Sequence, residues 1–284
     1  MNSQPLSTDL QHEIDRAVEQ ALQEDVGSGD LTANLIPINK SGNATVISRE
    51  PAVLCGGPWF EAAFRHLAPE TQIVWHAPEG ARVEVNQVLC EITGNARALL
   101  TGERTALNFL QMLSATATRT STYVDAIKGL KAAIVDTRKT IPGLRLAQKY
   151  AVRIGGGKNH RIGLYDGVLI KENHIMAAGG IGPALKAAEI SAPTGVMIMV
   201  EVEALSDLVE ALDQGAKLIL LDNFTIAQLS EAVQINGGRA ELEASGGVDL
   251  QTVRAIAETG VDRISIGTLT KDVKAIDLSM RFKA

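Results

Sequence analysis

In the first part of the chain, hydrophobic and polar residues form a helical pattern followed by short alternating runs. In LQHEIDRAVEQALQED, residues 10–25, apolar positions recur at helical spacing behind the capping candidates Ser7 and Thr8, which predicts an amphipathic helix. Short alternating runs follow and predict strands: NATVISRE, AVLCGG, TQIVWHA and VLCEITG. Residues 96–128 are mostly helix-forming. The pattern predicts a small N-terminal α+β domain, which we place at residues 1–115.

A different pattern of hydrophobic residues begins at Lys131. Six apolar runs recur with centres about 21 to 35 residues apart and helical patterns between them: AAIVD, GVLIK, GVMIMVEVE, AKLILLD, AELEAS and DRISIG. Strand–helix units at this spacing predict parallel strands joined by crossovers. Six units fall short of the eight of a complete barrel. We therefore expect an α/β fold with an incomplete (open) α/β barrel at residues 116–284, whose C-terminal tail packs back on the first domain.

Composition narrows the class of protein. The 284 residues are 45% hydrophobic and 21% charged, which is ordinary for a globular enzyme. We expect no secretory signal, no membrane span and two free, buried cysteines, hence a cytoplasmic protein. A net charge of −6 and only 4% aromatic residues argue against a nucleic-acid partner.

The stretch from Asp136 to His174 reverses the charge of the chain. It holds eight Lys/Arg and three acids, a local charge of +5. Such a cluster is self-repulsive unless an anion neutralises it. Because TRKT and KNHR are separated by turns, their cations can converge on one carboxylate or phosphate group.

Polar residues also end nearly every predicted strand: Asp136 and Arg138, Lys171, Glu201 and Glu203, Asp222, and Ser245. In barrels, this edge carries catalysis. The carboxylates of Glu201 and Asp222 suit Mg²⁺, sugar hydroxyls or a developing oxocarbenium ion, and their residue type does not separate these roles. By position alone, Glu203 is equally well explained as a solvated strand end.

Two glycine turns follow the last two predicted strands, ASGGV and SIGTLT, where barrels often bind phosphate through backbone N–H groups. The chain has no GxSxG, HExxH, P-loop or dinucleotide fingerprint. A protein nucleophile is therefore unsupported. The combination predicts a phosphorylated sugar that reacts beside a carboxylated partner.

Several of these segments closely resemble the quinolinate phosphoribosyltransferase family, also called carboxylating nicotinate-nucleotide pyrophosphorylases. They are DTRKTIPGLR, KYAVRIGGGKNHRIGLYDGVLIKENHI, VEVE, LLDNF and ELEASGGV, with EDVGSGDLT and GERTALNFLQ nearer the N-terminus. The resemblance implies a pentosyltransferase of NAD synthesis that uses Mg²⁺. It would join quinolinate to 5-phosphoribosyl 1-pyrophosphate and form nicotinate mononucleotide, pyrophosphate and CO₂. It also implies a homodimer, or a larger assembly, with active sites shared between subunits.

The same resemblance implies roles for particular residues. The implied catalytic residues are Lys139, Lys171, Glu201 and Asp222. The quinolinate carboxylates would be bound by Arg138, His160, Arg161, Lys171 and, from the partner subunit, Arg104. The pyrophosphate or ribose would lie near Thr137, Lys139 and Lys171. The ribose and Mg²⁺ would face Glu201 and Asp222, directly or through water. The 5′-phosphate would be held by Ser245, Gly246, Gly247, Gly267 and Thr268.

Two alternatives stay open. One is a close relative with a changed substrate, such as a nicotinate phosphoribosyltransferase or the similar protein found with molybdate transport genes. The other is a phosphate-sensing or nucleic-acid-binding protein that uses the basic stretch as a surface, for which strong salt dependence of binding would be diagnostic.

Overall fold

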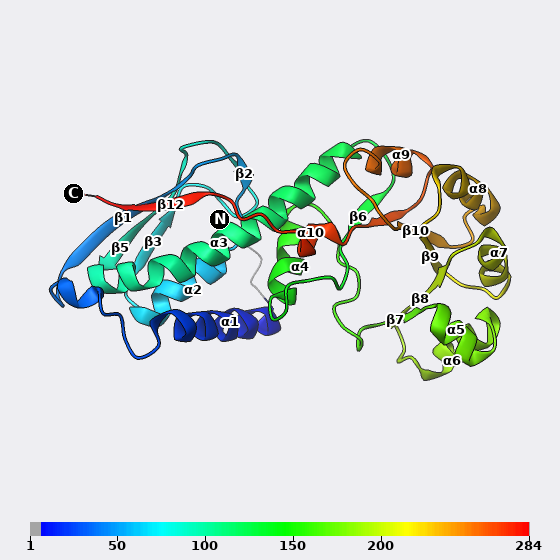
Figure 1. The fold of residues 1–284 in the computed structure, drawn as a ribbon, viewed down its shortest axis with the longest axis horizontal. Coiled ribbons are helices and arrows are strands. Elements are labelled where there is room, and N and C mark those ends of the chain that lie inside the picture. Colours follow the sequence, from blue (N-terminus) through cyan, green and yellow to red (C-terminus); the bar gives the residue numbers. More distant parts are fainter. Residues whose placement is uncertain (1–6, 284) are drawn as a thin grey trace. The chain divides into compact units, whose positions relative to one another are not determined.

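The computed structural model describes residues 7–283, and Figure 1 shows their fold. The first six residues, on which the expected absence of a secretory signal partly rests, lie outside the described residues. The chain divides into two compact units. Residues up to 121, 141–156 and from 272 onward form the first, and residues 122–140 and 157–271 form the second. The domain boundary expected after residue 115 stays a prediction.

The first unit is an α+β unit, as the alternating pattern predicts. Its helices are α1 (Thr8–Val26), the 3-10 turn η1 (Ala33–Leu35), α2 (Gly57–Leu67), the part of α3 (Ala96–Ala126) up to residue 121, and α4 (Arg145–Ile154). Its strands are β1 (Ser41–Ser48), β2 (Ala52–Val53), β3 (Gln72–Trp75), β4 (Arg82–Val83), β5 (Val88–Asn95) and β12 (Leu278–Phe282).

An antiparallel sheet and an apolar core hold the first unit together. The sheet has the order β12-β1-β5-β3, and β2 pairs separately with β4. The C-terminal strand β12 pairs with β1, with Met280 opposite Val46. Helix α1 starts at the predicted cap, where Ser7 Oγ accepts from Leu10 N at 3.3 Å, and it buries Ile14 and Val18. The largest core side chains are Trp59, Phe60 and Phe64.

The second unit is built on the six predicted parallel strands. They are β6 (Ala133–Val135), β7 (Gly167–Ile170), β8 (Met197–Val202), β9 (Leu218–Asp222), β10 (Glu241–Ser245) and β11 (Arg263–Ser265). The helices between and after them are α5 (Glu172–Ala178), α6 (Ile181–Ser191), α7 (Leu205–Asp213), α8 (Ile226–Asn236), α9 (Val253–Glu258) and α10 (Thr268–Lys271). Helices α5 to α9 lie along the outer side of the curved row of strands (Figure 1).

This sheet is an open barrel, which confirms the expected fold class. Its order is β6-β11-β10-β9-β8-β7, and within residues 7–283 the edge strands β6 and β7 do not pair with each other. Met199, Leu218 and Leu220 pack together on one face, while the alternate residues Ile219 and Leu221 are fully buried on the other. In the described part of the chain, no helix is both long and apolar enough to cross a membrane.

The basic KNHR segment lies along the open edge at β6. Lys158 N donates to Ile134 O at 2.8 Å, and Asp136 N donates to Lys158 O at 3.1 Å. These two backbone bonds make a parallel bridge between Val135 and Lys158. The open edge of the barrel therefore receives backbone partners from the very segment that carries the cations, and this brings KNHR beside the end of β6.

Candidate active site

The carboxyl ends of the parallel strands bring the predicted polar residues to one edge of the sheet. In the register of the sheet, Asp222 is level with Ser245. Glu201 is level with Leu220, which lies two residues before Asp222 on β9. Lys171 follows β7, Asp136 follows β6, and Gly267 lies just beyond β11. In a parallel sheet, residues level in register point to the same face, so Asp222 and Ser245 share a face, and the carboxyl ends of all six strands together form one rim.

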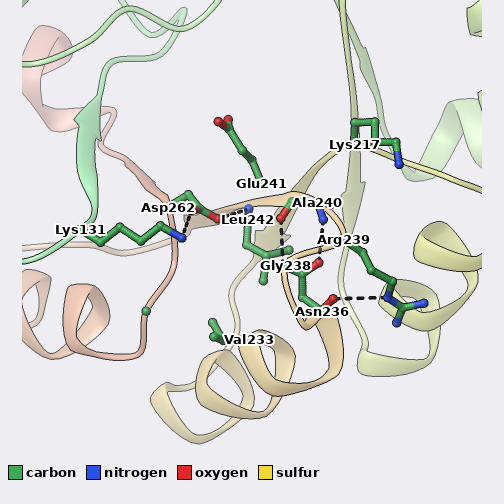
Figure 2. Close-up of a pocket in the computed structure, with 11 residues that line it drawn as sticks. Lys131, Lys217, Val233, Asn236, Gly238, Arg239, Ala240, Glu241, Leu242 and Asp262 are labelled. Carbon is green, nitrogen blue, oxygen red and sulfur yellow. Dashed lines mark hydrogen bonds and ion pairs between the residues drawn. The ribbon is translucent and has the colours of Figure 1, made fainter.

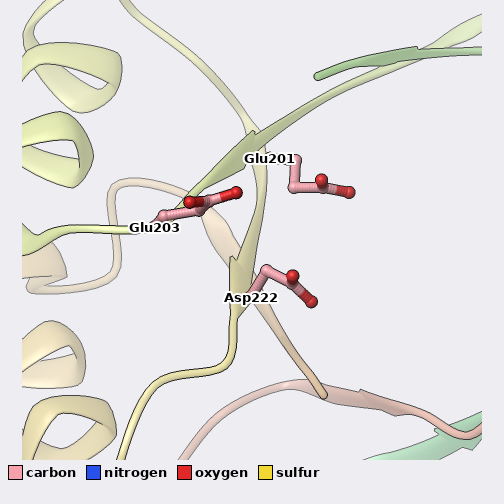
Figure 3. A group of neighbouring side chains, drawn as sticks. All are labelled: Glu201, Glu203 and Asp222. Atoms are coloured by element: carbon pink, nitrogen blue, oxygen red, sulfur yellow. The ribbon is translucent and has the colours of Figure 1, made fainter. Parts of the chain in front are cut away.

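Three carboxylates converge on this rim (Figure 3). Glu201, Glu203 and Asp222 each present an oxygen, and these oxygens all lie within 4.8 Å of one another. Glu203, which its sequence position leaves undecided, therefore belongs to the cluster. Lys171 Nζ lies 2.6 Å from Glu201 Oε2 and places a positive charge beside the cluster. Carboxylate oxygens are ligands that Mg²⁺ accepts, so these three residues could hold such an ion.

Two guanidinium groups, those of Arg138 and Arg161, lie close enough for their positive charges to influence each other. Burial, and then the positive charge of Arg138, lower the pKa of the Arg161 guanidinium, against the opposing influence of Asp166. Arg161 Nη1 donates to Gly167 O at 3.0 Å, which orients its side chain. Arg138 Nε is buried, and within residues 7–283 no hydrogen-bond acceptor reaches it. Two partly desolvated like charges favour an anionic ligand between or beside them.

Asp136 organises the loop that carries Arg161. Its carboxylate is fully buried and accepts from His160 N at 2.8 Å and from Asn159 Nδ2 at 2.6 Å. His160 Nδ1 in turn accepts from Arg161 N at 2.8 Å. An imidazole nitrogen that accepts carries no hydrogen, so the hydrogen of the neutral ring is on Nε2. That nitrogen lies 3.7 Å from the buried Glu243 carboxylate.

The glycine turns adopt conformations that side chains disfavour. Gly246 and Gly247 have φ values of 102° and 59°, in the left-handed region. Gly267 packs against the TRKT loop, where a Cβ would lie 2.9 Å from Lys139 Cδ. Thr137 Oγ1 accepts from Lys139 N at 3.1 Å. The structure thus places Thr137 and Lys139 beside Gly267, at the ends of the neighbouring strands β6 and β11.

Thr268 lies in the last of these turns and begins α10. Its hydroxyl oxygen is buried, and no hydrogen-bond partner reaches it among the residues that the structure describes. A buried hydroxyl without a partner loses the free energy of hydration that it would have in water. An incoming acceptor such as a phosphate oxygen would restore that interaction, and the role of Thr268 stays a prediction.

Arg104 is the one predicted site residue that belongs to the first unit. It is exposed on α3, between Gly102 and Ala106, which are both buried. All other predicted site residues belong to the second unit.

Below the rim, an ion pair is buried on the inner face of the sheet. Glu243 and Arg263 are opposite each other in register on β10 and β11, and Arg263 Nε lies 2.8 Å from Glu243 Oε2. The Glu243 side chain is completely buried, whereas the neighbouring Glu241 side chain is 62% exposed. Burial raises the pKa of Glu243, and Arg263 is the largest opposing influence.

Removing the buried carboxylate should destabilise the fold. Glu243→Ala leaves Arg263 without its close partner, and we expect the free energy of unfolding to fall by about 3 kcal/mol. Glu241→Ala is the matched control, because Glu241 Oε2 is 3.9 Å from the same guanidinium but solvated, and its loss should cost about 0.5 kcal/mol or less. Urea denaturation of both variants measures this difference. Equal free energies of unfolding for the two variants would contradict the idea that burial makes the Glu243–Arg263 pair important for stability.

A pocket of about 370 Å³ lies at the opposite edge of the sheet, near the start of the strands (Figure 2). Two of its cations are paired with acids. Lys131 Nζ lies 2.5 Å from Asp262 Oδ1, and Arg239 Nη1 lies 3.2 Å from Asp213 Oδ1. None of the predicted site residues lines this pocket. We therefore assign the pocket to the packing edge of the barrel rather than to catalysis.

Sequence reasoning passed over three residues that shape this site. The sequence marks Asp136 only as a strand end, yet its carboxylate accepts from the backbone of His160 and so organises the KNHR loop. Glu243 lies inside ELEAS, where its alternation with Leu242 and Ala244 could have indicated an inward carboxylate. Asn223 lies in LLDNF directly after Asp222, a position at which asparagine often marks a left-handed turn.

The chain is similar to known proteins along nearly its whole length. Residues 30–114 and 116–281 match the N-terminal and C-terminal domains of quinolinate phosphoribosyl transferase. It is 41% identical to a probable nicotinate-nucleotide pyrophosphorylase (carboxylating) of Bacillus subtilis, covering 90% of this chain and 89% of that protein. A Mycobacterium leprae nicotinate-nucleotide pyrophosphorylase (carboxylating) is also 41% identical, with 93% and 95% covered.

A solved structure shows the same similarity in three dimensions. The nicotinate-nucleotide pyrophosphorylase from Francisella tularensis matches with a TM-score of 0.93 and 45% identity, covering 99% of this chain and 98% of that one. Sequence and fold agree over both parts of the chain. The protein therefore belongs to the quinolinate phosphoribosyl transferase family.

Proposed function

We propose that this protein transfers phosphoribosyl from 5-phosphoribosyl 1-pyrophosphate to quinolinate with decarboxylation, giving nicotinate mononucleotide, pyrophosphate and CO₂. Family membership supports the reaction class. The observation that carries the substrate assignment is the pair of partly buried, mutually repelling guanidinium groups of Arg138 and Arg161. A dicarboxylate neutralises such a pair more completely than a monocarboxylate, and bidentate contacts also orient its ring.

In this proposal, His160 takes part in binding the quinolinate carboxylates, and it also holds Arg161 in place. Its Nδ1 accepts from the Arg161 backbone, and its ring is buried against Glu243. Arg138, Arg161 and Lys171 bind the two carboxylates, and Arg104 of the partner subunit joins them. The ring nitrogen is then presented to the anomeric carbon, so that orientation lowers the barrier without a protein nucleophile.

The acidic cluster fits Mg²⁺, and Glu201 and Asp222, with Glu203 beside them, would hold it directly or through water. When bound, the ion would supply positive charge to the pyrophosphate and orient the ribose. Lys139 and Lys171 add positive charge for the leaving pyrophosphate, and Glu201 and Asp222 stabilise the developing charge on the ribose. Ser245, Gly246, Gly247, Gly267 and Thr268 receive the 5′-phosphate through backbone N–H groups and the Thr268 hydroxyl.

The second half of the reaction follows from the first. Bond formation at the ring nitrogen leaves that nitrogen positively charged. The bond between the adjacent ring carbon and its carboxylate then breaks, CO₂ leaves, and the electron pair remains on the ring carbon next to the cationic nitrogen. A proton taken up at this carbon completes nicotinate mononucleotide. The residues that hold the remaining carboxylate keep the ring in place during this step.

We further propose a homodimer with shared active sites in the cytoplasm. Arg104 is exposed in the first unit, away in sequence from every other predicted site residue. Leu164 and Tyr165, which follow the KNHR segment, are 74% and 77% exposed, and in this proposal the partner subunit covers them. Both cysteines are buried and free, in keeping with a reducing compartment.

The activity can be tested directly. Purified protein is incubated with 5-phosphoribosyl 1-pyrophosphate, Mg²⁺ and either quinolinate or nicotinate, and nicotinate mononucleotide is followed by mass and absorbance. We expect product from quinolinate and none from nicotinate, and loss of activity when Mg²⁺ is chelated. Product from nicotinate alone would reassign the cation cluster, and product from neither substrate would overturn the proposed reaction.

A further inference from the structure

Asn223 has an unusual backbone conformation at the end of β9. Its φ is 58°, and among residues 7–283 the only other non-glycine residue with a positive φ is Asn86, at 62°. The left-handed region is disfavoured for residues with a side chain, although asparagine tolerates it better than most. Asn223 directly follows Asp222, so this conformation decides how the chain leaves the strand beside a carboxylate of the site.

The side-chain amide of Asn223 turns back onto Asp222. Asn223 Nδ2 donates to Asp222 Oδ2 at 2.8 Å. A carboxylate can only accept, so the amide nitrogen must face Asp222 and the amide oxygen must face away from it. One oxygen of Asp222 is thereby held by a charge-assisted hydrogen bond, which restricts the rotation of the carboxylate and leaves its other oxygen for a ligand.

The other side of Asn223 contacts the first glycine turn. Asn223 N donates to Ser245 O at 2.9 Å, in the turn that follows β10. A Cβ on Gly246 would lie 2.2 Å from Asn223 Oδ1 and 2.9 Å from Asn223 N, much closer than atoms can approach. Gly246 is thus required here both for its φ of 102° and for the close approach of Asn223. One residue therefore touches both the acidic cluster and the turn expected to hold the phosphate.

From these contacts we propose that Asn223 is a positioning residue for the phosphoribosyl substrate. It holds the Asp222 carboxylate toward the ribose and, through Ser245 and Gly246, sets the place of the 5′-phosphate turn relative to that carboxylate. This inference rests on the proposed function, because it takes 5-phosphoribosyl 1-pyrophosphate as the ligand. The two contacts act on opposite ends of the same sugar phosphate, so their effect falls on that substrate and spares quinolinate.

Asn223→Gly tests the proposal, because glycine accepts the left-handed backbone but lacks the amide. We expect the KM for 5-phosphoribosyl 1-pyrophosphate to rise about tenfold, because the variant loses the charge-assisted hydrogen bond between Asn223 and Asp222. The KM for quinolinate should change less than about twofold. Binding without turnover is measured by calorimetry with Mg²⁺ and phthalate, which has two adjacent carboxylates and no ring nitrogen to react. The Kd for 5-phosphoribosyl 1-pyrophosphate should rise by a similar factor.

Asn86→Gly is the matched control, since it makes the same substitution at nearly the same φ in the first unit. It should change stability as much as Asn223→Gly does and leave both KM values at the wild-type level. A wild-type Kd in Asn223→Gly, or equal losses for both substrates, would overturn the positioning role. Wild-type protein that binds the sugar phosphate but does not turn over would overturn only the proposed reaction. Wild-type protein that does not bind it at all would overturn both.

Discussion

Replacing Arg161 by alanine should lower kcat/KM for quinolinate by about 30- to 1,000-fold, which corresponds to about 2–4 kcal/mol of transition-state binding. The reason is electrostatic. Burial and the charge of Arg138 lower the pKa of Arg161, which means that the charged guanidinium is destabilised in the free protein. The negative charge of an anionic substrate would stabilise it. The kcat/KM of Arg161→Lys should lie between that of the wild type and that of Arg161→Ala, because lysine keeps the charge but not the bidentate geometry. Steady-state kinetics with quinolinate varied at saturating 5-phosphoribosyl 1-pyrophosphate measures the effect.

Arg239→Ala is the control for this prediction. Arg239 lines the pocket at the opposite edge of the same sheet and pairs with Asp213, so its removal takes away a positive charge without touching the rim (Figure 2). Its kinetics should be those of the wild type. If Arg239→Ala and Arg161→Ala lost activity equally, a general effect of charge on the unit would explain both, and the carboxylate-binding role of Arg161 would be wrong.

Mixing two inactive variants should restore activity if the sites are shared. Arg104→Ala and Lys171→Ala should each abolish most turnover, since each removes a cation from every site of its own homodimer. After subunit exchange of an equal mixture, half of the dimers are mixed, and each mixed dimer contains one intact site of two. We therefore expect about a quarter of wild-type activity, as follows from random reassociation of a two-fold dimer.

The control for this experiment uses two residues of the same unit. Lys139 and Lys171 both belong to the second unit, so a mixture of Lys139→Ala and Lys171→Ala contains no intact site in any dimer. It should recover nothing. Subunit exchange is verified separately by native mass spectrometry with one variant isotopically labelled. Recovery in the control, or its absence in the Arg104 mixture despite proven exchange, would contradict a site shared through Arg104.

Much of the fold could be predicted from hydrophobic periodicity. The six runs from AAIVD to DRISIG all became parallel strands of one sheet, and the helix behind Ser7 starts where its cap predicts. Other elements were not anticipated. Helix α4 carries Arg145 and Lys149 inside the basic stretch, and β4 has only two residues. Short strands and helices within charged segments have too few positions for a period to emerge.

The candidate site was predictable as a set of residues but not as an arrangement. Strand ends and glycine turns mark Glu201, Asp222 and Ser245, because parallel strands deliver their carboxyl ends to one edge. The membership of Glu203 was undecided, because a residue just past a strand end is equally often solvated. Only the convergence of three carboxylate oxygens within 4.8 Å decides it.

The sequence by itself determined the order of strands and helices and the identity of the charged residues at the strand ends, because side-chain alternation and turn chemistry are local properties of the chain. The tertiary structure alone decided that KNHR bonds to the open edge at β6, that His160 accepts from Arg161, and that Asn223 joins Asp222 to Gly246. These contacts link residues through backbone bonds and left-handed turns. Such partners are brought together only when the whole sheet has folded, and no local pattern of residues specifies them.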